Sequence, residues 1–140
     1  MLRYGWATNK QNWDAVPSEM VSASWTKIKF VSDSNVLVPA KRGVYLVEIN
    51  AGDIFSGSDL GNYASPIYTG HSTNLHQRFR QHVRGNTENN ISNKVSEFRN
   101  CLYFCFATFD DRPKDELKAL EQSLIEVFGP PLNSINSLSK

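Results

Sequence analysis

The apolar residues of this chain form three short runs that predict strands. The first covers 44–49, where the sequence Val-Tyr-Leu-Val-Glu-Ile is rich in β-branched residues and is typical of a central strand. The second covers 66–69 and ends at Gly70, after a loop from 52 to 65 that is rich in glycine, serine and aspartate. The third covers 102–107.

Apolar residues at helical spacing predict helices between and after these strands. One runs from 75 to 83, with Ser72-Thr73-Asn74 as candidate caps before it and Gly85 as a stop after it. A shorter helix is predicted from 91 to 98, and a longer one from 113 to 128, which a Gly-Pro-Pro sequence ends sharply. The whole pattern indicates one compact α+β domain.

Glu121 lies in the middle of the apolar face of the last predicted helix. The other residues of that face are Leu117, Leu120, Leu124, Ile125 and Phe128. An ionised carboxylate in such a position costs several kcal/mol unless a cation or strong hydrogen-bond donors meet it. A salt bridge with a residue such as Arg78 is one explanation, and a metal ion is the other. Because a buried salt bridge is itself costly, the sequence favours a metal ligand.

Length and composition place the chain among single-domain globular proteins. It has 140 residues, of which 40% are hydrophobic, and this is enough for one core. The first 35 residues are polar with scattered aromatic anchors, and we expect them to form an extension that packs on a domain of residues 36–140. A short edge element is expected at 36–38. The anchors are Tyr4, Trp6, Trp13, Trp25 and Phe30.

The cysteine positions and the lack of long apolar runs indicate a compartment. Cys101 and Cys105 lie four residues apart in an apolar stretch, where a strand would place them on the same side without letting them bond, so free thiols are expected. No apolar segment follows Met1, and no run is long enough to span a membrane. We therefore expect a cytoplasmic protein without a membrane partner.

Charge is balanced overall but uneven along the chain. The formal net charge of +1 does not by itself imply nucleic-acid binding. Basic residues outnumber acidic ones between 78 and 99, whereas acidic residues outnumber basic ones between 110 and 121. This distribution suits a phosphate-facing side next to a carboxylate site, although solvated helix surfaces are the alternative explanation. The candidate nucleic-acid contacts are Arg80, Arg84, Lys94 and Arg99.

Two short motifs and three later residues follow one another in a specific order. The motifs are Gly43-Val44-Tyr45 and Tyr68-Thr69-Gly70, and the later residues are Arg78, His82 and Glu121, with Pro131-Leu132-Asn133 near the end. From 43 to 133 this order resembles the GIY-YIG nuclease superfamily. The resemblance implies a small, mainly antiparallel sheet of three strands flanked by helices.

The resemblance also implies roles for individual residues. Tyr45, Tyr68, Arg78, His82 and Glu121 match catalytic positions, and Glu121 matches the metal ligand. Gly70, His71 and Asn133 match supporting positions.

The chain departs from the family pattern at three positions in or next to the two motifs. Val44 replaces an isoleucine, and Thr69 replaces an aliphatic residue. His71 stands where many members have lysine, and it can replace that lysine only in part, because histidine is mostly neutral near pH 7.

The expected activity is therefore metal-dependent hydrolysis of phosphodiester bonds in DNA. Glu121 would hold one Mg²⁺ or Mn²⁺ ion, and Arg78 would bind the phosphate oxygens. Tyr45, Tyr68 or His82 would act as the general base, and the sequence does not choose among them. The alternatives are a catalytically inactive nucleic-acid-binding module and a ribonuclease. A homodimer or a separate recognition partner would supply sequence specificity, since no reading head is recognisable in the chain.

Overall fold

The computed structural model describes residues 9–85, 91–94 and 96–133, and leaves out the side chains of residues 92, 94, 96 and 99. The strands are β1 (Thr26–Lys29), β2 (Gly43–Asn50), β3 (Ala64–Ser72) and β4 (Leu102–Thr108). The α-helices are α2 (Lys10–Asp14), α3 (Ser18–Ser22), α4 (Leu75–Arg84), α5 (Ile91–Lys94) and α6 (Lys114–Phe128). The 3-10 helices are η1 (Ser32–Leu37), η2 (Ala51–Asp53), η3 (Asp59–Asn62) and η4 (Ser96–Cys101).

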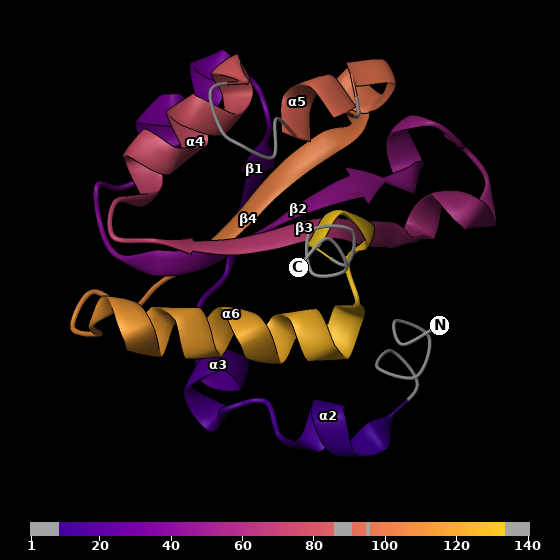
Figure 1. Ribbon diagram of the computed structural model, residues 1–140. Coiled ribbons are helices and arrows are strands. Elements are labelled where there is room, and N and C mark those ends of the chain that lie inside the picture. Colours follow the sequence, from indigo (N-terminus) through magenta and orange to yellow (C-terminus); the bar gives the residue numbers. More distant parts are fainter. Residues whose placement is uncertain (1–8, 86–90, 95, 134–140) are drawn as a thin grey trace.

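These strands form one antiparallel sheet in the order β1-β4-β2-β3 (Figure 1). The α+β class and the antiparallel pairing are confirmed, but the predicted number of three strands was wrong by one. The additional strand β1 lies within the first 35 residues and pairs with β4, with Ile28 opposite Phe104. Its apolar pattern is too short to predict a strand, because Ile28 is its one buried residue.

Helices cover both faces of this sheet (Figure 1). Helices α4 and α5 lie on one face, α6 lies on the other, and α2 and α3 pack beyond α6. Successive residues of β2 point to opposite faces, as strand geometry requires. Tyr45 and Val47 belong to the core on the α4 side, whereas Val44 and Leu46 pack in the core on the α6 side.

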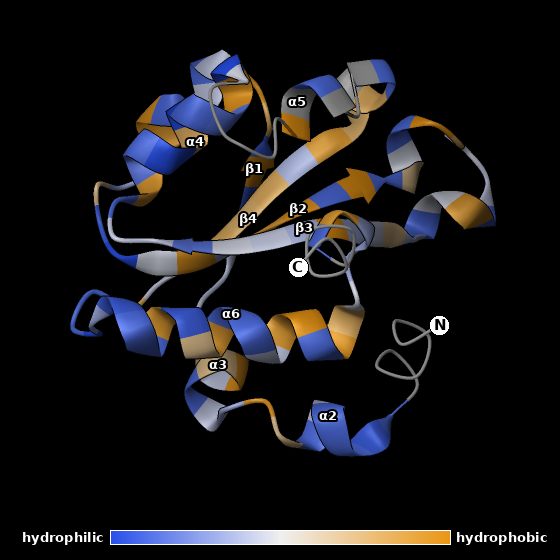
Figure 2. Ribbon diagram, in the orientation of Figure 1, coloured by the Kyte–Doolittle hydropathy of each residue, from blue (hydrophilic) through white to orange (hydrophobic). Residues whose placement is uncertain are grey.

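The two long helices end where the sequence predicted. Before α4, the Asn74 side chain accepts a hydrogen bond from the Gln77 backbone, and after it Gly85 adopts φ 77° as a left-handed cap. After α6, Gly129 adopts φ 52° in the same role. Figure 2 shows β2 and β4 as largely apolar, while α4 and α6 alternate between polar and apolar residues. None of the helices in the described ranges is long and apolar enough to cross a membrane.

Four local expectations changed in the structure. Residues 36–38 do not form an edge strand, because most of them belong to the 3-10 helix η1. The helix predicted at 91–98 is divided into α5 and η4. Strand β3 continues two residues beyond Gly70, to Ser72. Cys101 and Cys105 are both free, as expected, but Cys101 precedes β4 instead of lying in it.

The segment before β1 packs largely on α6. The Trp13 ring meets the Phe128 ring edge to face, with 5.5 Å between ring centroids. The Glu19 carboxylate pairs with the Arg112 guanidinium just before α6. The Trp25 indole instead bonds within the segment, donating to the Met20 carbonyl over 3.1 Å. Of the other three predicted anchors, Tyr4 and Trp6 lie outside the described residues, and Phe30 is buried in the core on the α4 side of the sheet.

Candidate active site

Tyr45 is the buried centre of the site. Its side chain is completely buried, and its ring stacks on Phe104 with 5.0 Å between ring centroids. The phenol oxygen of Tyr45 lies 2.6 Å from Nε2 of His82 on α4. The long strand β2 and the capped helix α4 therefore hold the two groups in a short, fixed hydrogen bond.

Gly70 makes room for the Tyr45 hydroxyl. The two residues lie opposite each other in the pairing of β2 with β3. A Cβ atom on Gly70 would stand 2.4 Å from the Tyr45 hydroxyl oxygen and 2.5 Å from the ring carbon that bears it. Any larger residue at this position would have to displace the tyrosine, so the glycine is required by this close approach.

Burial keeps both members of this pair neutral. Burial raises the pKa of Tyr45 well above its usual value of 10, and the adjacent Tyr68 adds to the rise. Burial, together with the charge of Arg78, lowers the pKa of His82 from 6.5 to about 3. Near pH 7 the hydrogen bond therefore joins a neutral phenol and a neutral imidazole.

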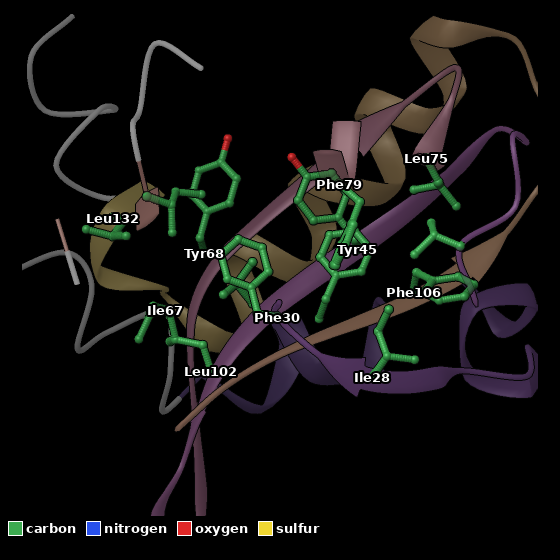
Figure 3. Packing of buried hydrophobic residues seen from close by; sticks show 14 residues of the cluster. Ile28, Phe30, Tyr45, Ile67, Tyr68, Leu75, Phe79, Leu102, Phe106 and Leu132 are labelled. Atoms are coloured by element: carbon green, nitrogen blue, oxygen red, sulfur yellow. The ribbon is translucent and has the colours of Figure 1, made fainter. Parts of the chain in front are cut away.

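Tyr68 is the second tyrosine of the same site. Its ring centroid is 6.2 Å from that of Tyr45 and 5.8 Å from that of His82. Figure 3 shows the hydroxyl groups of Tyr45 and Tyr68 pointing to the same side of the sheet. The structure thus brings together the two motif tyrosines and the histidine that the sequence singled out.

Arg78 stands one turn before His82 on α4. The positive charge of Arg78 and its side-chain hydrogen bond both lower the pKa of Tyr45, opposing part of the rise that burial causes. The side chain is half-buried, which leaves it accessible to an anion from solvent. Arg78 therefore joins the Tyr45 and His82 pair as the cationic part of the site.

Glu121 meets His71 on the other side of the strand. Oε1 of Glu121 lies 2.5 Å from Nδ1 of His71, and the two side chains are 17% and 18% exposed. The expected alternative to a metal ligand was a salt bridge between Glu121 and a residue such as Arg78, and the hydrogen-bond partner found is His71. This contact depends on the extra residues of β3, because His71 lies beyond the end predicted for that strand.

Asn133 fastens the segment after α6 to the edge of the sheet. Its side-chain oxygen accepts from the Thr69 backbone nitrogen over 2.7 Å, and its amide nitrogen donates to the Thr69 carbonyl over 2.8 Å. The Thr69 hydroxyl donates in turn to the Tyr45 carbonyl over 2.8 Å. Asn133 therefore holds β3 in place next to the tyrosines through its two hydrogen bonds to Thr69.

The two halves of the site meet at the edge of the sheet. Strand β3 is an edge strand, so groups on its two faces can approach each other around its free side. Both charged residues act on one hydroxyl group: Glu121 raises the pKa of Tyr45, and Arg78 lowers it. Tyr45, Arg78, His82 and Glu121 thus form one constellation, with Tyr68, Gly70 and His71 around it.

The predicted nucleic-acid contacts are described in part. Arg80 and Arg84 lie on α4 with exposed side chains. The side chains of Lys94 and Arg99 lie outside the described residues, so their predicted contacts have no structural counterpart here.

Glu121 is the residue that could hold a metal ion in this site. Throughout residues 9–85, 91–94 and 96–133, no three His, Cys, Asp or Glu side chains gather as a closed metal site. The carboxylate of Glu121 is partly exposed, and the contact with His71 involves one of its two oxygens. A hard cation that keeps most of its own water, as Mg²⁺ does, fits such a single oxygen ligand.

Comparison with known proteins places the chain in a family. The model of the GIY-YIG catalytic domain matches residues 41–136. The chain is also similar to solved structures of the GIY-YIG N-terminal endonuclease domain of UvrC from Thermotoga maritima. The form bound to magnesium is 24% identical, with a TM-score of 0.46, and the match covers 71% of this chain and 91% of that one. A point mutant bound to its catalytic divalent cation is 23% identical, with a TM-score of 0.46 and coverages of 71% and 90%.

No curated protein matches the chain. The match to the GIY-YIG family model covers well over half of the 140 residues. Its range includes every site residue from Tyr45 to Asn133. The chain therefore belongs to the GIY-YIG nuclease family.

Proposed function

We propose that this chain is a metal-dependent endonuclease that hydrolyses phosphodiester bonds in DNA through a single active site. The observation that carries the proposal is the buried hydrogen bond between Tyr45 and His82, with the charges of Arg78 and Glu121 both acting on the Tyr45 hydroxyl. A cation, a carboxylate and a proton-transferring pair are the groups that phosphodiester hydrolysis requires near one phosphorus atom.

Arg78 would bind the non-bridging oxygens of the scissile phosphate. Its planar guanidinium donates two parallel hydrogen bonds to such oxygens, which orients the phosphate as well as neutralising it. In the free protein Arg78 already lies beside the Tyr45 hydroxyl. A phosphate held by Arg78 would therefore stand next to the group that handles the proton.

Tyr45 and His82 would remove the proton from the attacking water as one unit. A tyrosinate is costly in this pocket, because burial raises the pKa of Tyr45. The hydrogen bond of 2.6 Å allows Tyr45 to accept a proton from water while it passes its own proton to Nε2 of His82. The negative charge of a bound phosphate would favour the imidazolium that forms. Tyr68 is the alternative base.

Glu121 would hold Mg²⁺ or Mn²⁺ at the rim of the site, through its carboxylate oxygens. When bound, the ion supplies positive charge against the charge that develops on the phosphate oxygens. His71 would orient the carboxylate through its contact with Oε1.

The proposal is tested by comparing three substrates under three conditions. Supercoiled plasmid, single-stranded DNA and RNA of the same sequence are incubated with Mg²⁺, Mn²⁺ or EDTA. The wild type is compared with Glu121→Gln. Glu126→Gln is the matched control, because it makes the same change about one and a half turns further along α6. We expect DNA cleavage by the wild type and the control, and none with EDTA or Glu121→Gln.

Other outcomes contradict the proposal in distinct ways. Cleavage of RNA alone would identify a ribonuclease. Binding of DNA without cleavage under any metal condition would identify an inactive binding module. Cleavage that persists in EDTA would show that the reaction does not require a metal ion.

A further inference from the structure

A groove lies between η1 and α4, on the side of α4 away from the catalytic residues. It consists of two adjoining hollows of about 110 and 370 Å³, and both are lined by Ser32, Val83 and Arg84. The smaller hollow also reaches Asn35 and Arg80, and the larger one reaches Asn93 on α5. Because they share three lining residues, the two hollows form one continuous groove beside α4.

Two arginines give this groove a positive charge. Arg80 and Arg84 are four residues apart on α4, so they project from the same face of the helix. Neither hollow is lined by an aspartate or a glutamate. Within the described part of the chain, no salt bridge involves either arginine. Both guanidinium groups therefore have their donors available for an anion.

The remaining polar residues of the groove also suit a phosphate backbone. Ser32, Asn35 and Asn93 offer one hydroxyl and two side-chain amides, which are side-chain types that commonly contact phosphate and sugar oxygens. The two walls are fixed to each other at one end, where Nδ1 of His76 lies 2.9 Å from the Val38 carbonyl oxygen. The groove is thus a preformed feature of the fold.

Along the axis of α4, the arginines of the groove lie close to Arg78. Arg84 is six residues after Arg78, which corresponds to roughly 9 Å along the helix axis. Each nucleotide of a strand advances about 3.4 Å along duplex DNA. Arg84 therefore lies about two to three nucleotides from the phosphate at Arg78, and Arg80, two residues after Arg78, lies about one nucleotide from it.

We infer that this groove binds the sugar–phosphate backbone of duplex DNA about one to three nucleotides from the scissile phosphate. Arg80 and Arg84 contact the phosphates, and the amides of Asn35 and Asn93 contact neighbouring backbone oxygens. The inference rests on the proposed function, since it takes DNA as the ligand and Arg78 as the scissile-phosphate contact. It adds a binding surface that contributes affinity and positioning without taking part in the chemistry.

The salt dependence of DNA binding tests this inference. Binding of a fluorescent DNA duplex is measured in EDTA, which prevents cleavage, over a range of salt concentrations. Each phosphate contact contributes about 0.9 to the slope of log affinity against log salt concentration. We expect the double variant Arg80→Ala/Arg84→Ala to lower that slope by about 1.8 and to keep the thermal stability of the wild type, because both side chains are exposed.

Two further variants make the result specific to the groove. The double variant Lys10→Ala/Lys114→Ala removes two exposed cations from α2 and α6, beyond the opposite face of the sheet, and should leave the slope unchanged. Asn35→Asp places a negative charge in the groove with almost no change of shape, and should weaken binding. If the slope stays the same in Arg80→Ala/Arg84→Ala and the protein still cleaves DNA, the groove does not bind DNA. The nuclease proposal would then remain intact. A wild type that neither binds nor cleaves DNA would overturn both.

Discussion

The two faces of strand β3 present opposite environments to the same site. On the α4 side, Tyr45 and His82 are buried among aromatic rings, and His82 is only 1% exposed. On the α6 side, His71 and Glu121 face each other at the rim, and the glutamate remains 17% exposed. The first region is dry and holds its groups neutral, whereas the second is wet enough to exchange ligands with solvent.

This difference indicates a division of labour. A buried hydrogen bond fixes the position of a proton, but burial makes any charge in that region costly. A partly exposed carboxylate can bind and release a cation, but it is less rigidly held. We infer that the fold separates proton transfer from ion binding by placing them on the two sides of an edge strand.

Arg78→Ala should have the largest effect, because this residue connects the two regions through the substrate phosphate. We expect cleavage to fall by on the order of 10³-fold, as for other arginines that neutralise a transferring phosphoryl group. Arg78→Lys keeps the charge but loses the planar fork, so it should recover part of that loss. Plasmid nicking rates measure both variants. Equal rates for Arg78→Ala and the wild type would show that the cation has no part in the reaction.

Gly70→Ala should damage the dry region without changing any charge. The added Cβ would collide with the Tyr45 hydroxyl and would displace it from His82. We expect a loss of about 1–3 kcal/mol of stability and on the order of 10²-fold in cleavage rate. Gly57→Ala is the control. Its Cβ would meet no atom within 4 Å, so only the cost of its positive φ remains. Full activity in Gly70→Ala would mean that the position of Tyr45 does not matter.

His71→Ala should affect the wet region more mildly. Removing a residue that orients a metal ligand typically costs about 10-fold or somewhat more in metal affinity or activity. We expect weaker Mn²⁺ binding by calorimetry and cleavage that recovers as the metal concentration is raised. Cleavage that is lost at every metal concentration would instead place His71 among the groups that act on the phosphate.

Burial of His82 in the dry region should make the free energy of unfolding depend on pH in the acidic range and leave it unchanged near pH 7. Its pKa of about 3 in the folded chain is lower than the value near 6.5 in the unfolded chain. The unfolded state therefore binds the proton first, and stability is complete above pH 6.5 and decreases as the pH falls toward 3. The decrease is about 1.4 kcal/mol per pH unit.

Denaturant unfolding between pH 7 and pH 4 measures this slope. His82→Gln should lose this contribution to the slope, and His76→Gln, the same change on the same helix, should retain it. Identical slopes in the two variants would show that burial of His82 is not what makes the folded state sensitive to acid.

Much of the framework could be predicted from the sequence, because its signals are local. The caps of α4 at Asn74 and Gly85 and the apolar face of α6 are contained within about fifteen residues each. Strand β1 could not be predicted, since it has one buried residue and depends on β4, which is distant in sequence, for its hydrogen bonds.

The structure brings several of the predicted site residues together, but the contacts between them could not be predicted from the sequence. Glu121 drew attention because it interrupts an apolar face, and the structure places it at the site. Its partner His71 could not be found from the pattern, because the contact depends on how far β3 extends and on where α6 lies against it. The bond between Tyr45 and His82 likewise joins residues 37 positions apart, and it turns two rival candidates for the base into one pair.

The most direct test of this division of labour is to measure cleavage and ion binding together in wild type, Tyr45→Phe and Glu121→Gln. Plasmid nicking reports the reaction, and calorimetric titration with Mn²⁺ reports the ion. We predict that both variants lose cleavage, and that only Glu121→Gln loses ion binding. Tyr45→Phe should bind the ion as the wild type does, since its hydroxyl belongs to the dry region. Loss of ion binding in Tyr45→Phe, or cleavage retained in Glu121→Gln, would contradict the separation of proton transfer from ion binding.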